Sequence, residues 1–291
     1  MKASAFSYAR ARSVEDALTL LAEHSEKAKV LSGGQSLMPA LNLRLVSPDL
    51  IVDIGGVDEL RGATVRGDTL AIGALTRHAD LLRSPEIRLH APLLSQAAPH
   101  IAHPAIRNRG TIGGSLAHAD PAAELPACML ALDATMIVRS LAGERRLAAS
   151  DFFKGIYETA LSPEELLVAV ELPIRKSAAQ YFNEFARRHG DYAIAGVAAQ
   201  ALLGKEVFHD LRIALFAIGD RPVLARSTAD LVDKVVTQPL VTDVAAAIAD
   251  ELDPPDDQQA SPAMRKQLAR VLIARCISTL LDRPDLDARA A

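Results

Sequence analysis

LSGGQSLMPALNLRL, residues Leu31 to Leu45, places two adjacent glycines between a short apolar run and a run with helical spacing. Glycine weakens a helix or strand that contains it, because its backbone loses more conformational freedom on folding than that of any other residue. The pair therefore indicates a position where the backbone itself must be bare. We interpret Lys29–Leu31 as a short strand and the segment after Ser36 as a helix, so the pair lies at a strand–loop–helix junction.

A second glycine pair, Gly113-Gly114, lies in the stretch IRNRGTIGGSLAHADPAAELP and again precedes an apolar helical run. The plain interpretation of either pair is a turn that needs a positive φ angle. Each pair is also flanked by hydroxyl side chains, which are Ser32 and Ser36 in the first loop and Thr111 and Ser115 in the second. Such loops offer backbone N–H donors and hydroxyls with no Cβ to block a ligand, so they favour a phosphate or pyrophosphate.

The common nucleotide and hydrolase fingerprints are absent from the sequence. It has no G-x-G-x-x-G that opens a βαβ unit, no G-x-x-x-x-G-K-[ST], no H-E-x-x-H and no G-x-S-x-G. A phosphate-bearing ligand would therefore require a nucleotide-binding fold other than the Rossmann or P-loop type.

Length and composition predict an ordinary globular protein of two or more domains. The chain has 291 residues, of which 49% are hydrophobic and 23% charged. A net charge of −4, only 4% aromatic residues and no Trp disfavour nucleic acid as a partner. The N-terminus lacks an apolar leader, and the longest uncharged apolar stretch, 192–204, is shorter than a membrane span. We therefore expect a cytoplasmic protein with no membrane span.

The two cysteines, Cys128 and Cys276, lie far apart in apolar, helix-like runs. They exclude a disulfide framework and an iron–sulfur cluster with four thiolate ligands within this chain. We interpret both as small buried hydrophobic residues.

Local patterns predict the order of the elements. Ser13 begins a helix with a capping-box pattern, and 63–72 is a hairpin that turns at Gly67-Asp68. Strands are predicted at 50–54, 135–139 and 166–172, and Pro173 with the polar stretch after it marks a boundary near residue 176. Beyond the boundary we expect strands at 181–187 and 211–218, helices at 229–236 and 244–252, and a last helix capped by Ser261. The predicted buried face of that last helix carries Leu268, Val271, Leu272, Cys276 and Leu280.

The polar residues His100, His103, His118, Asp120 and Glu124 form the one conspicuous cluster of possible metal ligands in the sequence. A stand-alone metal-dependent hydrolase that uses His100, His103 and Asp120 is the remote alternative. The favoured interpretation is a set of polar groups that line a pocket or a subunit surface. The stretch FARRHGDYA, 185–193, is either a solvated strand end or the position of an aromatic ring against a planar ligand, and the residues alone do not choose between them.

Four motifs, in this order and spacing, carry a family resemblance: SGGQSLMP, IRNRGTIGGSLAHADPAAELP, LLVAVELP and FARRHGDYA. They closely resemble the FAD-binding medium subunit of molybdenum hydroxylases, a group that includes the medium subunits of carbon monoxide dehydrogenase and quinoline oxidoreductase and the flavin domain of xanthine dehydrogenase. The resemblance covers essentially the whole chain and extends to the C-terminal stretch MRKQLARVLIARCI.

The resemblance implies an α+β architecture. Residues 1–176 would form an FAD-binding domain of the vanillyl-alcohol-oxidase (PCMH) type, with two α/β subdomains split near 55–60. Residues 177–291 would form the smaller C-terminal α/β domain of these flavoprotein subunits. The two glycine loops would wrap the FAD pyrophosphate, an acidic residue would bond the ribityl or nearby hydroxyls, two apolar residues would line the flavin pocket, and a Gly-Asp-Tyr aromatic would lie near the isoalloxazine ring. The implied residues are Ser32, Gly33, Gly34, Gln35, Ser36, Ile101, Thr111, Ile112, Gly113, Gly114, Ser115, Glu124, Leu167 and Tyr192.

Some positions depart from the family pattern. Gln35 stands where some relatives have His, and Ser115 where many have Asn, but both keep hydrogen-bonding ability. His103-Pro104 replaces an acidic-Pro pair of the carbon monoxide dehydrogenase version, which weakens carbon monoxide as the substrate. The cysteine-bearing insertion of the benzoyl-CoA-reductase branch is missing.

The function that the resemblance implies is electron transfer. Substrate would be hydroxylated at a molybdenum cofactor in a large partner subunit, and electrons would pass through [2Fe–2S] clusters of a small partner subunit to FAD in this chain and then to an external acceptor. We expect a dimer of heterotrimers and, by family analogy, an N-heteroaromatic substrate. A structural subunit with an empty flavin site is the alternative that flavin absorbance would discriminate.

Overall fold

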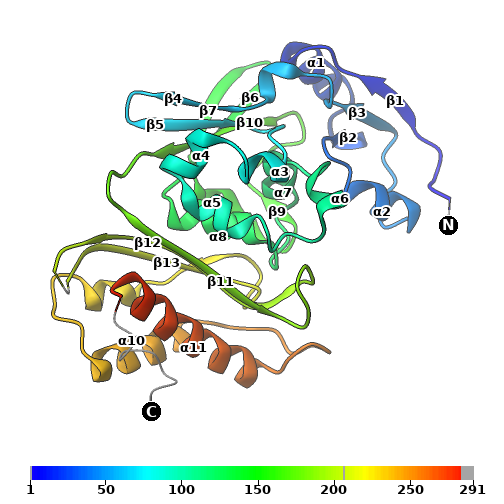
Figure 1. The fold of residues 1–291 in the computed structure, drawn as a ribbon. Helices are drawn as coiled ribbons and strands as arrows, with labels where there is room; N and C mark the ends of the chain where they lie inside the picture. Colours follow the sequence, from blue (N-terminus) through cyan, green and yellow to red (C-terminus); the bar gives the residue numbers. More distant parts are fainter. Residues whose placement is uncertain (1, 206, 283–291) are drawn as a thin grey trace.

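The computed structural model describes residues 2–205 and 207–282 (Figure 1). At the N-terminal end, three parallel strands form a small sheet in the order β1 (Ser7–Arg10), β3 (Leu50–Asp53) and β2 (Ala28–Leu31). The helix α1 (Val14–His24) connects β1 to the chain before β2 and buries one apolar face. The predicted cap of this helix is confirmed, because Ser13 Oγ accepts a hydrogen bond from Asp16 N at 3.1 Å.

A five-stranded antiparallel sheet follows in the order β4-β5-β10-β6-β7. Its strands are β4 (Ala63–Arg66), β5 (Thr69–Gly73), β6 (Thr135–Ser140), β7 (Gly143–Ala148) and β10 (Leu166–Pro173). Short helices follow or lie between its strands along the chain: α3 (His78–Leu81), α4 (Pro85–His90), α5 (Pro92–Ala97), α6 (Pro104–Arg107), α7 (Ile112–His118), α8 (Glu124–Ala131) and α9 (Ala149–Phe152). The helix α2 (Leu37–Asn42) lies beside the N-terminal sheet (Figure 1). A separate two-stranded ribbon consists of β8 (Phe153–Gly155) and β9 (Glu158–Thr159).

The C-terminal half contains a four-stranded antiparallel sheet, β11 (Ala179–Ala186), β12 (Ala193–Leu203), β13 (Phe208–Phe216) and β14 (Val223–Leu224). Its outer face packs on α11 (Pro262–Leu280), which in turn packs on α10 (Gln238–Asp250), and its inner face packs on α5 and α8 (Figure 1). Alternate side chains of β12 therefore enter different cores: Val197 and Ala199 face the C-terminal helices, whereas Ala198 joins the core around α8. Burial on both faces explains why the sequence of β12 is an unbroken apolar run.

The structure confirms the hairpin that turns at Gly67-Asp68 and the strands expected at 50–54, 135–139, 166–172, 181–187 and 211–218, with shifts of a few residues at their ends. The prediction of a helix at 229–236 is wrong. A 3₁₀ turn, Ser227–Leu231, ends inside this range, and Asp233 N donates to Phe208 O at 2.8 Å. A backbone hydrogen bond that the local apolar spacing does not reveal thus holds the chain at the start of β13.

The buried face of α11 differs in part from the prediction. Leu272, Cys276 and Leu280 are buried as expected, but Leu268 and Val271 are only half-buried. Ala269, Ile273 and Ile277 complete the buried face. The face is wider than a narrow helical stripe because α11 packs against α10 and against the strands β11 and β12.

Candidate functional site

The first glycine loop, 32–36, connects β2 to α2. Gly34 has a φ of +73°, in the left-handed region where glycine is favoured. A Cβ on Gly33 would lie 2.3 Å from Arg109 O, so a side chain at this position is sterically excluded. The Gln35 side chain closes the loop, with Nε2 donating to Gly33 O at 2.9 Å. Ser36 precedes α2 but its hydroxyl makes no capping bond to the helix.

The N–H groups of this loop are available to a ligand. No hydrogen bond among the described residues uses the N–H of Gly33, Gly34, Gln35 or Ser36. Successive unpaired N–H groups around a left-handed residue form a concave anion-binding nest. The loop is therefore chemically suited to a phosphate or diphosphate group.

The second glycine pair is not a turn. Thr111 is the N-cap of α7, its Oγ1 accepts from Gly114 N at 3.1 Å, and Gly113 and Gly114 form the first turn of the helix without a positive φ. A Cβ on Gly113 would lie 2.5 Å from Ala74 Cβ. The expectation of a positive-φ turn is thus wrong for this pair, since the bare backbone here permits the helix to pack closely on Ala74.

The backbone donors of this segment are occupied. Ile112 N and Gly113 N donate to Thr76 O and Ala74 O, each at 2.9 Å, and Ser115 N donates to Thr111 O at 3.0 Å. The second loop therefore offers mainly hydroxyl groups and the start of a helix, whereas the first loop supplies the unpaired amides.

The two loops meet although they are far apart in the sequence. Ser32 Oγ and Thr111 Oγ1 are 2.7 Å apart, and a Cβ on Gly33 would be 2.8 Å from Gly110 Cα. A Cβ on Gly114 would approach Ser32 Cβ at 3.7 Å. The predicted pyrophosphate-binding residues of both loops are therefore brought to one place, where hydroxyls and free amides adjoin.

His78, which the sequence patterns did not single out, holds the second loop in place. Its Nε2 lies 2.9 Å from Thr111 O, and its ring occupies the space that a Cβ on Gly110 would need. Burial lowers the pKa of His78 to about 4, so the ring is neutral at pH 7 and its Nε2–H donates to the carbonyl. No pattern around His78 distinguishes it from a surface residue of a short helix.

Ile101 lies in a loop that Arg107 organises. Arg107 Nη1 donates to the carbonyl oxygens of Pro99, Ile101 and Ala102 at 3.1, 2.9 and 2.8 Å. Gly190, from the β11–β12 loop, packs on this segment, and a Cβ at Gly190 would lie 2.7 Å from Ala102 O. The structure thus joins the predicted apolar position Ile101 to the Gly-Asp-Tyr loop.

A group of acidic and aromatic residues lies between α7, α8 and the β11–β12 loop. Burial, with the nearby charges of Glu184 and Asp120, raises the pKa of Glu124 to about 8, so its carboxyl is mainly protonated at neutral pH. Burial also raises the pKa of Tyr192, and the charges of Asp120 and Glu124 raise it further. Asp120 is thus close enough to both Glu124 and Tyr192 for its charge to affect both groups.

Two predicted positions have side chains in the main core. Ile112 is fully buried, and Leu167 is 4% exposed on β10, paired with Val138 of β6. Ala74 N donates to the neighbouring Val168 O at 2.9 Å and Ala74 O accepts from Gly113 N at 2.9 Å. The strand β10, which carries Leu167, is thus connected to the second glycine loop through Val168 and the backbone of Ala74.

The histidines do not form a metal centre. Within residues 2–205 and 207–282 there is no group of three or more His, Cys, Asp or Glu side chains that could hold a metal ion. His100 instead pairs with Glu184, Nδ1 to Oε1 at 3.2 Å, and its ring lies against Phe182.

Among the described helices, none is long and apolar enough to cross a bilayer.

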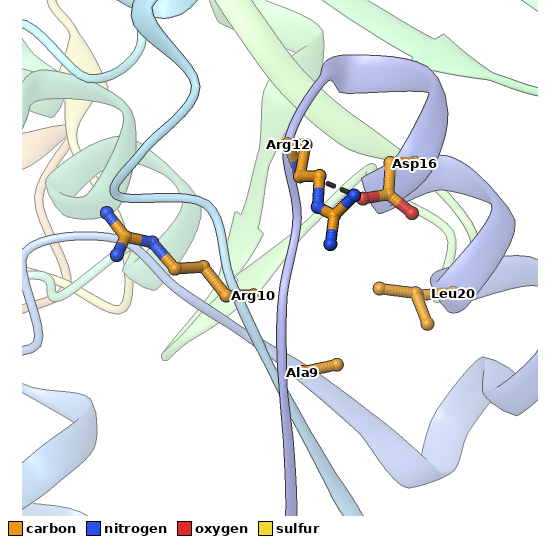
Figure 2. Close-up of a pocket in the computed structure, with 5 residues that line it drawn as sticks. All are labelled: Ala9, Arg10, Arg12, Asp16 and Leu20. Atoms are coloured by element: carbon orange, nitrogen blue, oxygen red, sulfur yellow. Dashed lines mark hydrogen bonds between the residues drawn. The ribbon is translucent and has the colours of Figure 1, made fainter.

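A surface depression of about 510 Å³ lies away from the glycine loops and is lined by Ala9, Arg10, Arg12, Asp16 and Leu20 (Figure 2). The side chains of Arg10 and Arg12 point to opposite sides of the strand (Figure 2). Arg12 N donates to Asp16 Oδ2 at 2.9 Å, and the guanidinium of Arg10 packs beside Gly56. The two cations do not converge, so this depression is not suited to an anionic ligand.

Comparison with known proteins gives the family. Residues 4–175 match the family described as FAD binding domain in molybdopterin dehydrogenase, and residues 180–280 match the CO dehydrogenase flavoprotein C-terminal domain. The chain is 42% identical over 286 residues to the 6-hydroxypseudooxynicotine dehydrogenase complex subunit alpha of Paenarthrobacter nicotinovorans, with 97% of each chain covered.

Solved structures agree with this assignment. A chain of quinoline 2-oxidoreductase from Pseudomonas putida 86 matches with a TM-score of 0.92 and 39% identity, covering 97% of this chain and 99% of that one. A chain of carbon monoxide dehydrogenase from Hydrogenophaga pseudoflava matches with a TM-score of 0.95 and 33% identity over the same shares. Because both halves of the sequence match and the fold agrees over nearly its full length, the chain belongs to the FAD-binding medium subunits of the molybdenum hydroxylases.

Proposed function

We propose that this chain receives electrons from [2Fe–2S] clusters of a small partner subunit and passes them through FAD to an external acceptor. The chain is an oxidoreductase subunit with an FAD-binding domain, and its relatives belong to multi-subunit dehydrogenase complexes. When bound, FAD supplies the ability to accept electrons one at a time and release them as a pair. The task of the protein is to bind and orient that group.

The observation that carries the proposal is the contact of the two glycine loops. Gly33, Gly34, Gln35 and Ser36 present unpaired N–H groups beside the Ser32 and Thr111 hydroxyls, which lie 2.7 Å apart. Unpaired donors and a backbone that no side chain shields suit the two negative charges of a dinucleotide diphosphate. Gly113, Gly114 and Ser115 complete this surface from the α7 side.

The remaining predicted residues are assigned to the other end of the cofactor. A protonated Glu124 can donate its O–H to a ribityl or ring oxygen without adding a buried negative charge. Tyr192, which is 61% exposed, offers a ring face against the isoalloxazine. Ile101 and Leu167 supply the apolar surroundings that exclude water.

We also propose the wider organisation that the resemblance implied. A large molybdenum-cofactor subunit and a small [2Fe–2S] subunit would join this chain in a dimer of heterotrimers. Residues 1–176 would form the FAD-binding domain and 177–291 the C-terminal domain. Both cysteines are buried free thiols, which supports a reducing cytoplasmic location.

An N-heteroaromatic compound is the proposed substrate class of the complex. This chain is more similar in sequence to the quinoline 2-oxidoreductase chain, at 39% identity, than to the carbon monoxide dehydrogenase chain, at 33%. Quinoline is an N-heteroaromatic compound, whereas carbon monoxide is not. Substrate assays on the purified complex, with quinoline-type compounds compared with carbon monoxide, test this part of the proposal.

Flavin content after gentle purification tests the central proposal. We expect the wild-type chain to carry noncovalent FAD and the Gly33→Val variant to lose it, because its side chain would overlap Arg109 O and force the loops apart. Circular dichroism of both proteins reports whether the rest of the chain remains folded. A folded wild-type chain that takes up no FAD at micromolar concentrations would instead support the structural subunit with an empty flavin site.

A further inference from the structure

Arg265, in the first turn of α11, is a buried cation that contacts the ends of two strands and a loop. The residue is 3% exposed, whereas arginine is almost never this buried unless it is paired. Its Nη2 donates to both carboxylate oxygens of the exposed Asp257, at 2.9 and 2.7 Å, so the buried charge is compensated. Its Nη1 donates to the backbone oxygens of Ile194 and Ala217, each at 2.6 Å. One guanidinium therefore joins the start of β12, the end of β13 and the loop before α11.

The first of these carbonyls belongs to the strand that follows Tyr192. Ile194 lies two residues after Tyr192, at the start of β12. On the other side of the β11–β12 loop, Arg187 Nη2 donates to Gln258 O at 3.0 Å. The β11–β12 loop is thus tied at both ends to the loop before α11, directly at Arg187 and through Arg265 at Ile194.

The second carbonyl belongs to Ala217, which has a φ of +60° directly after β13. Left-handed alanine is uncommon and persists where the surrounding contacts over-determine it. Here both backbone groups of Ala217 are bonded, because its N donates to Pro121 O at 2.9 Å while its O accepts from Arg265. Pro121 lies three residues before Glu124, the first residue of α8. A continuous chain of hydrogen bonds therefore leads from Arg265 to the segment that precedes Glu124.

We infer that Arg265 is a positioning residue of the flavin site, which holds the segment of Tyr192 and the segment of Glu124 in one fixed arrangement. Arg265 acts through the backbone of Ile194 and Ala217, since it is itself buried. The inference rests on the proposed function, in which Tyr192 and Glu124 serve the isoalloxazine end of FAD. It gives the C-terminal half of the chain a part in shaping a site whose glycine loops lie in the N-terminal half.

Arg265→Lys in the full chain tests this role. Lysine keeps the buried positive charge, but a single ammonium group cannot reproduce the planar fork that joins two carbonyls to a carboxylate. We expect fluorescence titration to show a loss of FAD affinity of about tenfold, the effect of losing one hydrogen bond to a charged group. We also expect the visible circular dichroism of the bound flavin to change, because that signal reports the surroundings of the ring rather than the stability of the chain.

The same substitution in a Tyr192→Ala or Glu124→Ala background shows whether Arg265 acts through those residues. We expect the loss of FAD affinity to shrink to about threefold in at least one background, because a side chain that has been removed cannot be misplaced. Equal losses in the wild type and in both backgrounds would mean that Arg265 contributes to stability alone, and the positioning role would be rejected.

Asp257→Asn is the second variant, for the case in which far-ultraviolet circular dichroism shows that Arg265→Lys does not fold. Its amide oxygen still accepts one hydrogen bond, but the guanidinium loses its paired charge and its second acceptor. We expect a loss of FAD affinity of about threefold and a change in the flavin signal. In that case, wild-type affinity and an unchanged flavin signal in folded Asp257→Asn would reject the positioning role.

Arg212→Lys is the matched control. Arg212, on β13, also joins a carbonyl to a carboxylate, because its Nη2 donates to Leu130 O at 2.9 Å and lies 2.9 Å from Asp133 Oδ1. This contact is at the opposite end of α8 from Glu124. We expect wild-type FAD affinity and flavin signal. An equal loss in Arg212→Lys would assign the effect of Arg265 to the general stability of the contact between the two halves. A wild-type chain that takes up no FAD overturns the proposed function, and the positioning role with it.

Discussion

The two glycine pairs have the same letters and neighbouring hydroxyls but opposite physical roles. In the first, Gly34 occupies a left-handed conformation and four successive N–H groups are unpaired. In the second, the backbone is helical and its N–H groups are already hydrogen-bonded. Only glycine fits at position 113, because Ala74 lies against it. One pair creates a surface for a ligand, whereas the other brings a helix close enough to support that surface.

This difference explains why the site needs both loops. Unpaired amides in a mobile loop would hold an anion poorly, because ordering the loop would oppose binding. The second loop is fixed by bonds to Thr76 and Ala74, and Ser32 Oγ meets Thr111 Oγ1 across the contact. The second loop is therefore held in place, and its contact with the first loop orders the ligand-facing amides.

The largest expected effect concerns the support provided by His78. Its pKa of about 4 in the folded chain lies below the ordinary value of 6.5, so between these pH values the unfolded chain binds more protons. The contribution of His78 to the free energy of unfolding is therefore fully present above about pH 6.5 and is lost as the pH falls toward 4. The total loss is about 3 kcal/mol, of which about 2 kcal/mol has occurred by pH 5.

Urea unfolding at pH 7.5 and pH 5 measures this loss. His78→Gln is the matched variant, because its amide can still donate to Thr111 O but does not titrate. We expect the wild type to lose about 2 kcal/mol more than the variant over this interval. A parallel decline of both proteins would show that His78 does not couple pH to the second loop.

A smaller effect is expected at Gly34, in the ligand-facing loop. Gly34→Ala places a Cβ at a φ of +73°, which costs about 1–2 kcal/mol, and we expect FAD affinity to fall about tenfold. Gly67→Ala is the control, because Gly67 also has a positive φ of +59° but a Cβ there would have no atom within 4 Å of it in the hairpin. Fluorescence titration with FAD should separate the two variants. Equal affinities would remove the first loop from the binding site.

The smallest effect is the direct link between the loops. The Ser32–Thr111 hydroxyl pair should have a coupling energy of about 1 kcal/mol in a double-mutant cycle of Ser32→Ala and Thr111→Val, followed by urea unfolding. Thr111→Val alone also removes the cap of α7, so the single variants are unequal. Strictly additive effects would mean that the two loops do not stabilise each other through this contact.

Much of the fold followed from local patterns. Ser13 and Ser261 cap helices as their positions predicted, and the Gly67-Asp68 hairpin has its expected turn. These signals are reliable because caps and tight turns depend on hydrogen bonds and dihedral angles within a few residues. The helix predicted over 229–236 failed because a backbone bond from Asp233 to distant Phe208 overrides the local spacing.

The candidate site was predicted less completely. The motifs pointed to both glycine loops and to Tyr192, but not to His78, which is separated from its partner Thr111 by 33 positions in the sequence. A neutral buried histidine leaves no periodic trace. Its role depends on what lies opposite it in space.

The sequence by itself determined that two bare, hydroxyl-flanked segments exist and that the chain resembles a flavoprotein subunit, because glycine content, caps and motif order are properties of the chain alone. Only the tertiary structure decided which pair exposes its amides and which pair is packed shut. The same Gly-Gly dipeptide satisfies a left-handed turn or a close helix contact equally well, so its role depends on the backbone conformation and on the distant backbone or side chain that packs against it, which is Arg109 O for Gly33 and Ala74 for Gly113.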